Sequence, residues 1–147
     1  MQDQDYMKEA LKQAQIAYDN DEVPVGAIIV YRGKIIACGH NTNDCDNSPL
    51  SHAEINVINK ASKYLNSKVL DECTMYVTLE PCMMCTGAII NARLKKVYFA
   101  AFDLKQGAIL SNQFYKDSKD IDWQPGLLQD ESTQLLKLYF EEKRKEQ

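Results

Sequence analysis

Five residues carry the pattern in this sequence that is richest in chemistry: His52, Glu54, Pro81, Cys82 and Cys85. Cys82 and Cys85 are three positions apart at the start of a predicted helix, where thiolates can face one ion and the helix dipole favours their negative charge. His52 stands at the start of another predicted helix, thirty residues before Cys82. One imidazole and two thiolates suit tetrahedral zinc, and three protein ligands leave its fourth position open, as in catalytic sites. We therefore predict one Zn²⁺ per subunit, held by these three residues.

Glu54 follows His52 by two positions and is not needed as a ligand. Bound zinc lowers the pKa of a water molecule towards neutrality, and the released proton needs an acceptor close by. A carboxylate at this position can take that proton and deliver it to a substrate. Glu54 is therefore the predicted catalytic residue.

Other interpretations of the cysteines remain open at this level. A Cys-x₂-Cys pair alone is also typical of a redox pair or of half a structural zinc site. If Cys45 or Cys73 completed the coordination sphere, the chain would be a non-catalytic binding module stabilised by zinc, and Glu54 would have no purpose. In the simpler interpretation Cys38, Cys45 and Cys73 are small buried or surface thiols, and His40 is a loop residue.

The elements that must position these residues alternate along the chain. Apolar residues at helical spacing predict helices at residues 6–18, 51–65, 81–92 and 130–147. Runs rich in β-forming residues predict strands at 25–31, 34–39, 73–79 and 95–101. Arg32 and Gly33 would close a hairpin between the first two strands, Pro81 would take the first position of its helix, and residues 111–126 are ambiguous. The alternation predicts a mixed sheet with helices on its faces, in a single domain spanning residues 1–147.

Composition restricts the class of protein. The net charge of −4 is unlike that of a strongly basic nucleic-acid binder. A polyanion would therefore meet a local basic patch, for which the candidates are residues 93–96, Lys105 and the tail at 141–147. No apolar run approaches the roughly 20 residues of a membrane span, and the acidic, polar start is unlike a signal peptide. Five cysteines in a chain of this length favour thiols over disulfides, so we expect a cytoplasmic protein without a membrane partner.

The order His-x-Glu followed by Pro-Cys-x-x-Cys is the signature of zinc-dependent deaminases. Around it, the chain resembles the cytidine deaminase superfamily and, within it, the bacterial tRNA-specific adenosine deaminases, from residue 6 to about residue 107. The resemblance is carried by the segments EVPVGAIIV, GHN, SHAEINVI, YVTLEPCMMCTGAII and FDLKQGA. The forms VTLEPCMMC and D-x-K-x-G-A are closer to the tRNA enzymes than to the free-base deaminases.

The resemblance implies a three-layer α/β/α fold around a five-stranded mixed sheet, and a homodimer whose sites lie near the subunit interface. By position, Asn41 would hydrogen-bond the target base, Val25 and Ala53 would shape the walls of the pocket, and Lys105 would contact phosphates of the tRNA. Without the resemblance, Asn41 is equally well read as a turn residue and Lys105 as a solvated loop lysine.

The implied activity is hydrolytic conversion of adenosine to inosine at the wobble position of tRNA, with release of ammonia. The anticodon loop is single stranded, so its base can enter a pocket at little unpairing cost. The C-terminal part, residues 111–147, departs from the family pattern: the segment before the last helix is short, acidic and without histidine, and Glu141 and Glu142 replace an expected basic or neutral surface. A deaminase of a free base or nucleoside, such as guanine, cytosine or adenosine, is therefore the alternative.

Overall fold

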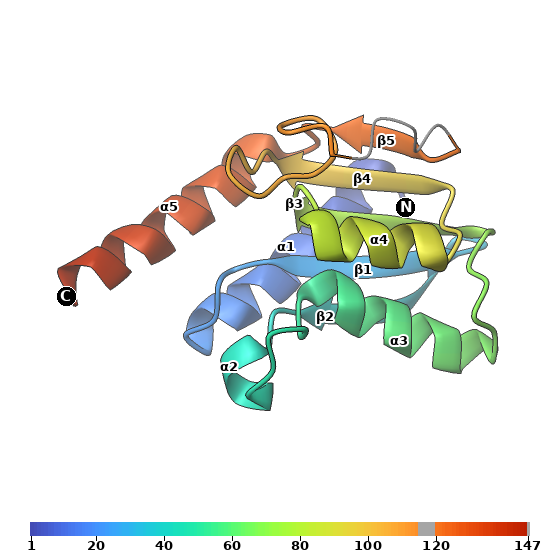
Figure 1. Ribbon diagram of the computed structural model, residues 1–147, viewed down its shortest axis with the longest axis horizontal. Helices are drawn as coiled ribbons and strands as arrows, with labels where there is room; N and C mark the ends of the chain where they lie inside the picture. The colour runs from blue at the N-terminus through green and yellow to red at the C-terminus, as the bar shows by residue number, and fades with distance from the viewer. Residues whose placement is uncertain (115–119, 147) are drawn as a thin grey trace.

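A five-stranded mixed sheet forms the middle layer of the molecule (Figure 1). The computed structural model describes residues 1–114 and 120–146. The strands are β1 (Gly26–Tyr31), β2 (Lys34–His40), β3 (Cys73–Leu79), β4 (Lys96–Ala101) and β5 (Asp122–Pro125), arranged in the order β2-β1-β3-β4-β5. Strand β1 pairs antiparallel with β2 and β3, whereas β3, β4 and β5 run parallel to one another.

Helices cover both faces of this sheet. Helices α1 (Asp3–Asp19) and α5 (Gln129–Lys145) pack on one face, and α3 (Ala53–Leu65) and α4 (Met83–Asn91) lie on the other (Figure 1). One short helix, α2 (Asn43–Asp46), interrupts the loop before α3. The expected three-layer α/β/α fold with a five-stranded mixed sheet is confirmed. Among the described residues, no helix combines the length and the apolar character that crossing a membrane requires.

The core has two parts because the side chains of each strand alternate between the faces of the sheet. On the side of α3 and α4, fully buried side chains include Ile29, Val57, Met75, Val77, Ile89, Val97 and Phe99. On the side of α1, the buried cluster includes Tyr6, Met7, Ala10, Ile28, Tyr76 and Ala100. Strand β1 is apolar on both faces and lies inside the sheet, which explains its nearly continuous run of hydrophobic residues.

Three features of the fold differ from the sequence-based expectations. Pro81 is not the first residue of its helix: α4 begins at Met83, and Cys82 is the N-cap with extended backbone. A turn of α2 forms within the segment expected to be a loop. The ambiguous segment 111–126 contains β5, which pairs with β4 in the register Lys96 to Asp122; residues 115–119 of that segment lie outside the described part of the chain.

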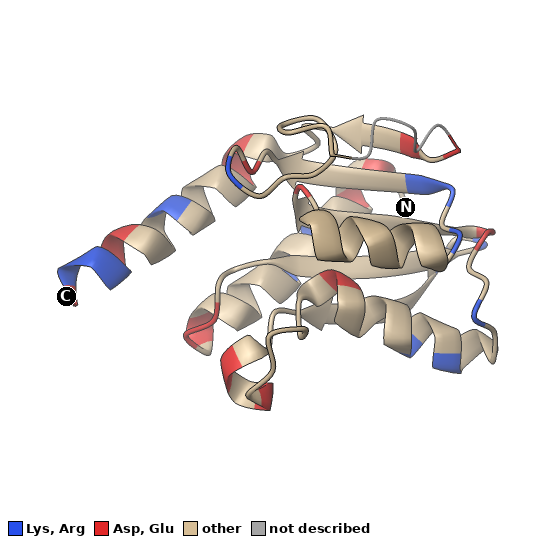
Figure 2. Cartoon of the chain, in the orientation of Figure 1, with Lys and Arg blue, Asp and Glu red and all other residues tan. Residues whose placement is uncertain are grey.

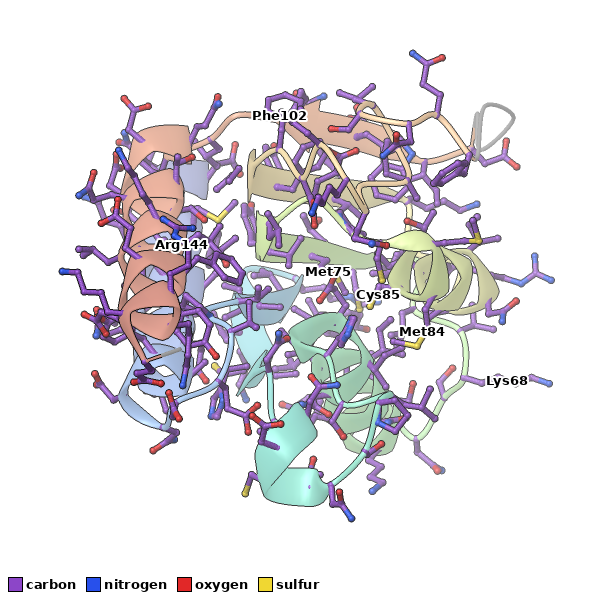
Figure 3. All side chains as sticks on the ribbon, turned by 60° about the vertical axis from the view of Figure 1, so that its left-hand side comes forward. Lys68, Met75, Met84, Cys85, Phe102 and Arg144 are labelled. Carbon is purple, nitrogen blue, oxygen red and sulfur yellow. The ribbon has the colours of Figure 1, made fainter. Side chains whose placement is uncertain are left out.

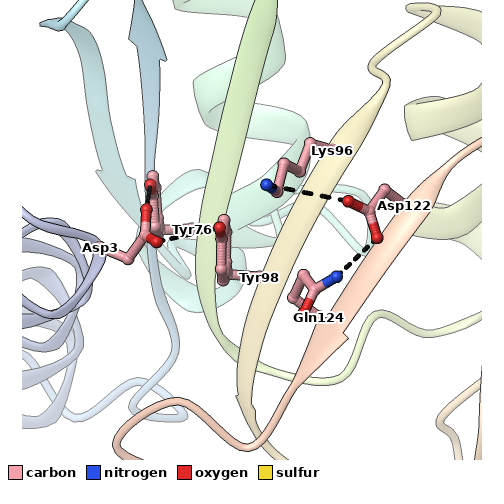
Figure 4. Close-up of polar contacts among 6 residues, drawn as sticks. All are labelled: Asp3, Tyr76, Lys96, Tyr98, Asp122 and Gln124. Carbon is pink, nitrogen blue, oxygen red and sulfur yellow. Dashed lines mark hydrogen bonds and ion pairs between the residues drawn. The ribbon is translucent and has the colours of Figure 1, made fainter.

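Asp3, the first residue of α1, accepts two phenol hydrogen bonds from the sheet (Figure 4). Tyr76 Oη donates to Asp3 Oδ1 at 2.5 Å, and Tyr98 Oη donates to Oδ2 at 3.0 Å. The rings of Tyr76 and Tyr98 are stacked, with centroids 4.7 Å apart. At the next strand, Lys96 and Asp122 form an ion pair of 3.8 Å between β4 and β5. The start of α1 is thus fastened to β3 and β4.

This contact predicts an alkaline loss of stability. Burial, and then the hydrogen bond to Asp3, raise the pKa of Tyr76 above its ordinary value of about 10. Above that pH the unfolded chain releases a phenol proton that the folded chain keeps, so the free energy of unfolding falls as the pH rises; below it the contribution is fully present. Tyr76→Phe should lower stability by about 1–2 kcal/mol at neutral pH and flatten the alkaline decline. Urea unfolding from neutral to alkaline pH measures both the loss of stability and the alkaline slope.

Tyr64→Phe is the matched control, because Tyr64 is exposed and its hydroxyl accepts a hydrogen bond from Lys34 on the surface. The control should keep the alkaline slope of the unchanged protein. Equal slopes in the Tyr76→Phe variant and the unchanged protein would contradict the assignment.

Candidate active site and metal centre

The predicted metal ligands meet where two helices begin. His52 is the N-cap of α3 and Cys82 is the N-cap of α4, and both have extended backbone there. Cys85 follows in the first turn of α4 and is fully buried in the interior of the molecule (Figure 3). The chain reaches Cys82 directly from the carboxyl end of β3. The end of this strand therefore fixes the position of Cys82.

The three ligand atoms already lie at distances that suit coordination. His52 Nδ1 is 3.7 Å from Cys82 Sγ and 3.4 Å from Cys85 Sγ, and all three atoms lie within 4.8 Å of one another. A tetrahedral zinc ion with ordinary bond lengths requires a nitrogen–sulfur separation of about 3.5 Å. Within the described part of the chain, neither Cys45 nor Cys73 joins the group, so it offers three protein ligands.

The electrostatics of the thiols favour a cation. A hydrogen bond from Cys85, supported by His52, lowers the pKa of Cys82 to about 4. The same contact with Cys82, together with burial, raises the pKa of Cys85. Two thiolates this close repel each other, so both ionise only beside a positive charge. An imidazole and two soft sulfur donors in tetrahedral reach suit Zn²⁺.

Glu54 shares a cavity of about 380 Å³ with His52 and Cys82. Its side chain lies in the first turn of α3 and is only 4% exposed. Burial raises the pKa of Glu54 to about 7. A carboxyl group with a pKa near the working pH can both accept and return a proton, which is the property required of a general acid–base.

The residues expected to touch the substrate are distributed differently. Val25 and Asn41 line this cavity. Asn41 is held at both ends: its N–H donates to the carbonyl of Val25 at 3.1 Å, and its side-chain oxygen accepts the N–H of Ala53 at 2.8 Å. Ala53 itself is fully buried in the core beneath the cavity and does not line it. Lys105 lies on a neighbouring groove, beside Phe102 and Phe140.

The family model of the MafB19-like deaminases matches residues 1–143. The chain belongs to this deaminase family. Two curated relatives, both named tRNA-specific adenosine deaminase, are similar to this chain over most of its length. The one from Rickettsia typhi is 46% identical over 144 residues, which cover 94% of this chain and 97% of that protein. The one from Bacillus subtilis is 41% identical over 150 residues, covering 98% of this chain and 92% of that protein.

Solved structures give the same picture of the fold. A structure from a study of A-to-I editing by tRNA:A34 deaminases superposes with a TM-score of 0.85 at 38% identity, covering 89% of this chain and 98% of that one. A guanine deaminase from Bacillus subtilis reaches a TM-score of 0.67 at 41% identity, covering 69% of this chain and 66% of that one. Both purine-acting relatives therefore share the architecture of this deaminase.

Three residues on the cavity of this deaminase did not stand out from the sequence as site residues. Glu22 is buried and accepts the N–H groups of Asp44 and Cys45 at 3.1 and 2.8 Å, which caps α2. Glu80 is buried two positions before the predicted ligand Cys82, and Tyr139 reaches the cavity from α5. Only the two glutamates left a sign of their role in the sequence. Each is an acidic residue next to apolar residues, in the segments EVPVG and VTLEPC.

Helix α5 contacts α1 and the residues just after it, and Glu142, which departs from the expected family pattern, takes part in these contacts. Tyr18 donates a short hydrogen bond to Glu142, and Lys143 pairs with Asp21 at 2.5 Å. The rings of Tyr18 and Tyr139 meet edge to face with centroids 6.3 Å apart. Glu142 thus has a role within the chain, because its contact helps to hold Tyr139 at the cavity.

Proposed function

We propose that this deaminase converts adenosine to inosine at the wobble position of tRNA by hydrolysis, releasing ammonia. The observation that carries the proposal is the grouping of His52, Cys82 and Cys85 beside a cavity that the buried carboxyl group of Glu54 shares with His52 and Cys82. Relatives named for this activity match the chain over more than nine-tenths of its length, which supports the choice of substrate.

The proposed metal is Zn²⁺, one per chain, held by His52 Nδ1 and the sulfur atoms of Cys82 and Cys85. When bound, the ion would supply an acidified water molecule at its open position. Glu54 would accept a proton from the attacking water and deliver it to N1 of the adenine. It would then take the proton of the new C6 hydroxyl and pass it to the amino group, which leaves as ammonia when the C6–N bond breaks.

Asn41 would orient the base. Because its side-chain oxygen accepts the N–H of Ala53, the amide is held in one orientation, and its NH₂ group is left to donate to an acceptor on the base. Val25 would form an apolar wall against the ring. In this arrangement the contribution of Ala53 is its backbone N–H, which orients Asn41.

A homodimer in the cytoplasm is the proposed setting. Several large apolar side chains on α4 and on the loop after β4 are exposed, among them Met83 at 51%, Leu104 at 81% and Phe114 at 55%. A contact between two copies of the chain would cover such groups. All five cysteines are free thiols, as expected for a reducing compartment.

The test of the substrate is release of ammonia from an anticodon stem-loop carrying adenosine at the wobble position, compared with free guanine, cytosine, adenine and their nucleosides. Turnover of the stem-loop with conversion to inosine is the expected result. Activity on small molecules alone would end the proposal for tRNA.

Deamination of a free base is the second candidate, and one observation favours it. The Bacillus subtilis guanine deaminase is as similar in sequence, at 41% identity, as some of the tRNA-specific relatives, although over only 69% of this chain. Guanine turnover in the same panel, without turnover of the stem-loop, is the result that would support it.

Lys105 provides a prediction about nucleic-acid contact. Basic residues recur along the last turns of α5 (Figure 2). Lys105 lies on the groove beside that helix together with Lys137. Lys105→Ala should lower kcat/KM on the stem-loop by about three- to tenfold and make it less sensitive to salt, because a phosphate contact is lost. Steady-state kinetics at several salt concentrations measure both effects.

Lys68→Ala is the control, because Lys68 is exposed and points away from the body of the molecule (Figure 3). It should leave kcat/KM and the salt slope unchanged. An equal loss in both variants, or none in Lys105→Ala, would remove Lys105 from the proposed tRNA surface.

A further inference from the structure

Glu80 is a buried carboxylate on the cavity that the proposed chemistry does not use. It follows β3 and precedes Pro81, and only 2% of it is exposed. Its Oε1 accepts the N–H of Asp103 at 3.2 Å and the hydroxyl of Ser111. Its Oε2 accepts the N–H groups of Ile109, Leu110 and Ser111 at 3.2, 2.9 and 3.0 Å.

These five donors occupy the carboxylate. Its two oxygens offer about four lone-pair directions, so no acceptor position is left for a cation or for a proton in transit. Glu54, in contrast, faces the metal ligands from the same cavity. The two glutamates therefore have separate roles: one suits proton transfer, and the other is committed to the backbone of a loop.

The loop after β4 is built around this carboxylate. While Glu80 satisfies its N–H groups, the side-chain amide of Asn112 donates to the carbonyls of Leu104, Lys105 and Gly107 at 3.2, 3.2 and 2.9 Å. Gly107 passes so close that an added Cβ would lie 2.4 Å from Cδ of Glu80. No residue with a side chain fits there without displacing Glu80 or the loop.

The same loop supplies a wall of the cavity. Asp103 and Gln106 line it, and the side chain of Asp103 accepts the N–H of Gln106 at 3.0 Å, which holds both in one turn. Further along, the N–H of Ala108 donates to the carbonyl of Pro81 at 2.9 Å, next to the ligand Cys82. The position of this wall relative to the metal ligands thus depends on contacts that converge at Glu80 and Pro81.

We propose that Glu80 is a positioning residue: it holds the loop of residues 103–112 so that Asp103 and Gln106 form the wall against which the substrate is seated. The role rests on the proposed function, since it concerns how the substrate is bound. It explains why the segment FDLKQGA carries a glycine at position 107, because the loop must pass directly over the carboxyl group.

Glu80→Gln tests the role, because glutamine keeps the shape but replaces one acceptor oxygen by an NH₂ group. We expect the amide protons of residues 103 and 109–111 to exchange at least about tenfold faster while those of the strands stay protected. We expect KM for the stem-loop to rise about tenfold and kcat to fall less than about threefold, with metal content unchanged. A merely structural role would instead lower the active fraction and leave KM unchanged.

Glu72→Gln is the matched control, since Glu72 lies just before the opposite end of β3, its side chain is 62% exposed, and it pairs with Arg32 on the surface. The Glu72→Gln variant should match the unchanged protein in amide exchange and in KM. Unchanged exchange or an unchanged KM in Glu80→Gln would overturn the proposal. If Glu80→Gln does not fold, Asn112→Ala loosens the same loop from its exposed side; it should also raise KM, and a normal KM would overturn the proposal.

Failure of the proposed tRNA activity and failure of the positioning role of Glu80 give different results. If the unchanged enzyme does not act on the stem-loop, the proposed tRNA activity is wrong, whereas the exchange rates still decide whether Glu80 holds the loop. The KM comparison is then made with whichever compound of the substrate panel is deaminated.

Discussion

Replacement of Glu54 by glutamine or alanine is expected to lower kcat by about a hundredfold to ten-thousandfold, the usual contribution of a general acid–base, while the enzyme keeps one zinc ion per chain. Glu54 is buried on the cavity that His52 and Cys82 also line, and burial brings the pKa of its carboxyl group to about 7. Glutamine fills the same space and cannot carry the proton. Single-turnover kinetics together with metal analysis of the same sample separate loss of proton transfer from loss of the metal.

The controls decide between a catalytic and a structural role. Glu131→Gln changes an exposed carboxylate in the first turn of another helix, α5, and should leave kcat unchanged. A Glu54→Gln variant that turns over at more than about a tenth of the normal rate is incompatible with the general acid–base role. Loss of zinc from that variant would instead make Glu54 part of the metal site.

The positions of most elements could be predicted because local physics determines them. Strand β3 was expected at residues 73–79 and forms at Cys73–Leu79, since its apolar residues alternate between two buried faces. The hairpin turn follows from Arg32 and Gly33, which both adopt positive φ angles. Strand β5 could not be predicted, because Asp122–Pro125 is mostly exposed and is ordered by pairing with β4 over a long sequence separation.

The predicted metal ligands and Glu54 stood out for a different reason. Each lies at a predicted helix start, and their order along the chain matches the signature of zinc-dependent deaminases, which is what joined His52 and Cys82 across thirty positions. The role of Glu80 is not local: it binds backbone N–H groups between 23 and 31 positions further along, and backbone donors leave no mark on side-chain composition. Ala53 is a similar case. Its place next to His52 could be recognised from the sequence, but its burial beneath the cavity depends on how α3 packs and could not be predicted.

Replacement of Cys85 by serine is expected to remove the metal, abolish deamination and lower the melting temperature. Cys85 is fully buried, and its sulfur lies 3.4 Å from His52 Nδ1. A serine hydroxyl is a harder donor that does not ionise near neutral pH, so the site would keep two good ligands and its affinity would fall by at least about a hundredfold. Because a bound ion joins the starts of α3 and α4, its loss also removes the stabilisation that binding gives to the folded state.

Metal analysis, thermal unfolding with and without a chelator, and turnover form one test of this prediction. The chelator should lower the melting temperature of the unchanged enzyme and leave that of Cys85→Ser unaffected, since the variant has no ion to lose. Cys73→Ser is the matched control: Cys73 is also buried, at 3% exposed, but it begins β3 at the end opposite Cys82. This control should lose some stability and keep both zinc and activity. Loss of zinc from Cys73→Ser would make Cys73 a fourth ligand, and a closed Cys₃His centre has no open position for the water that deamination requires.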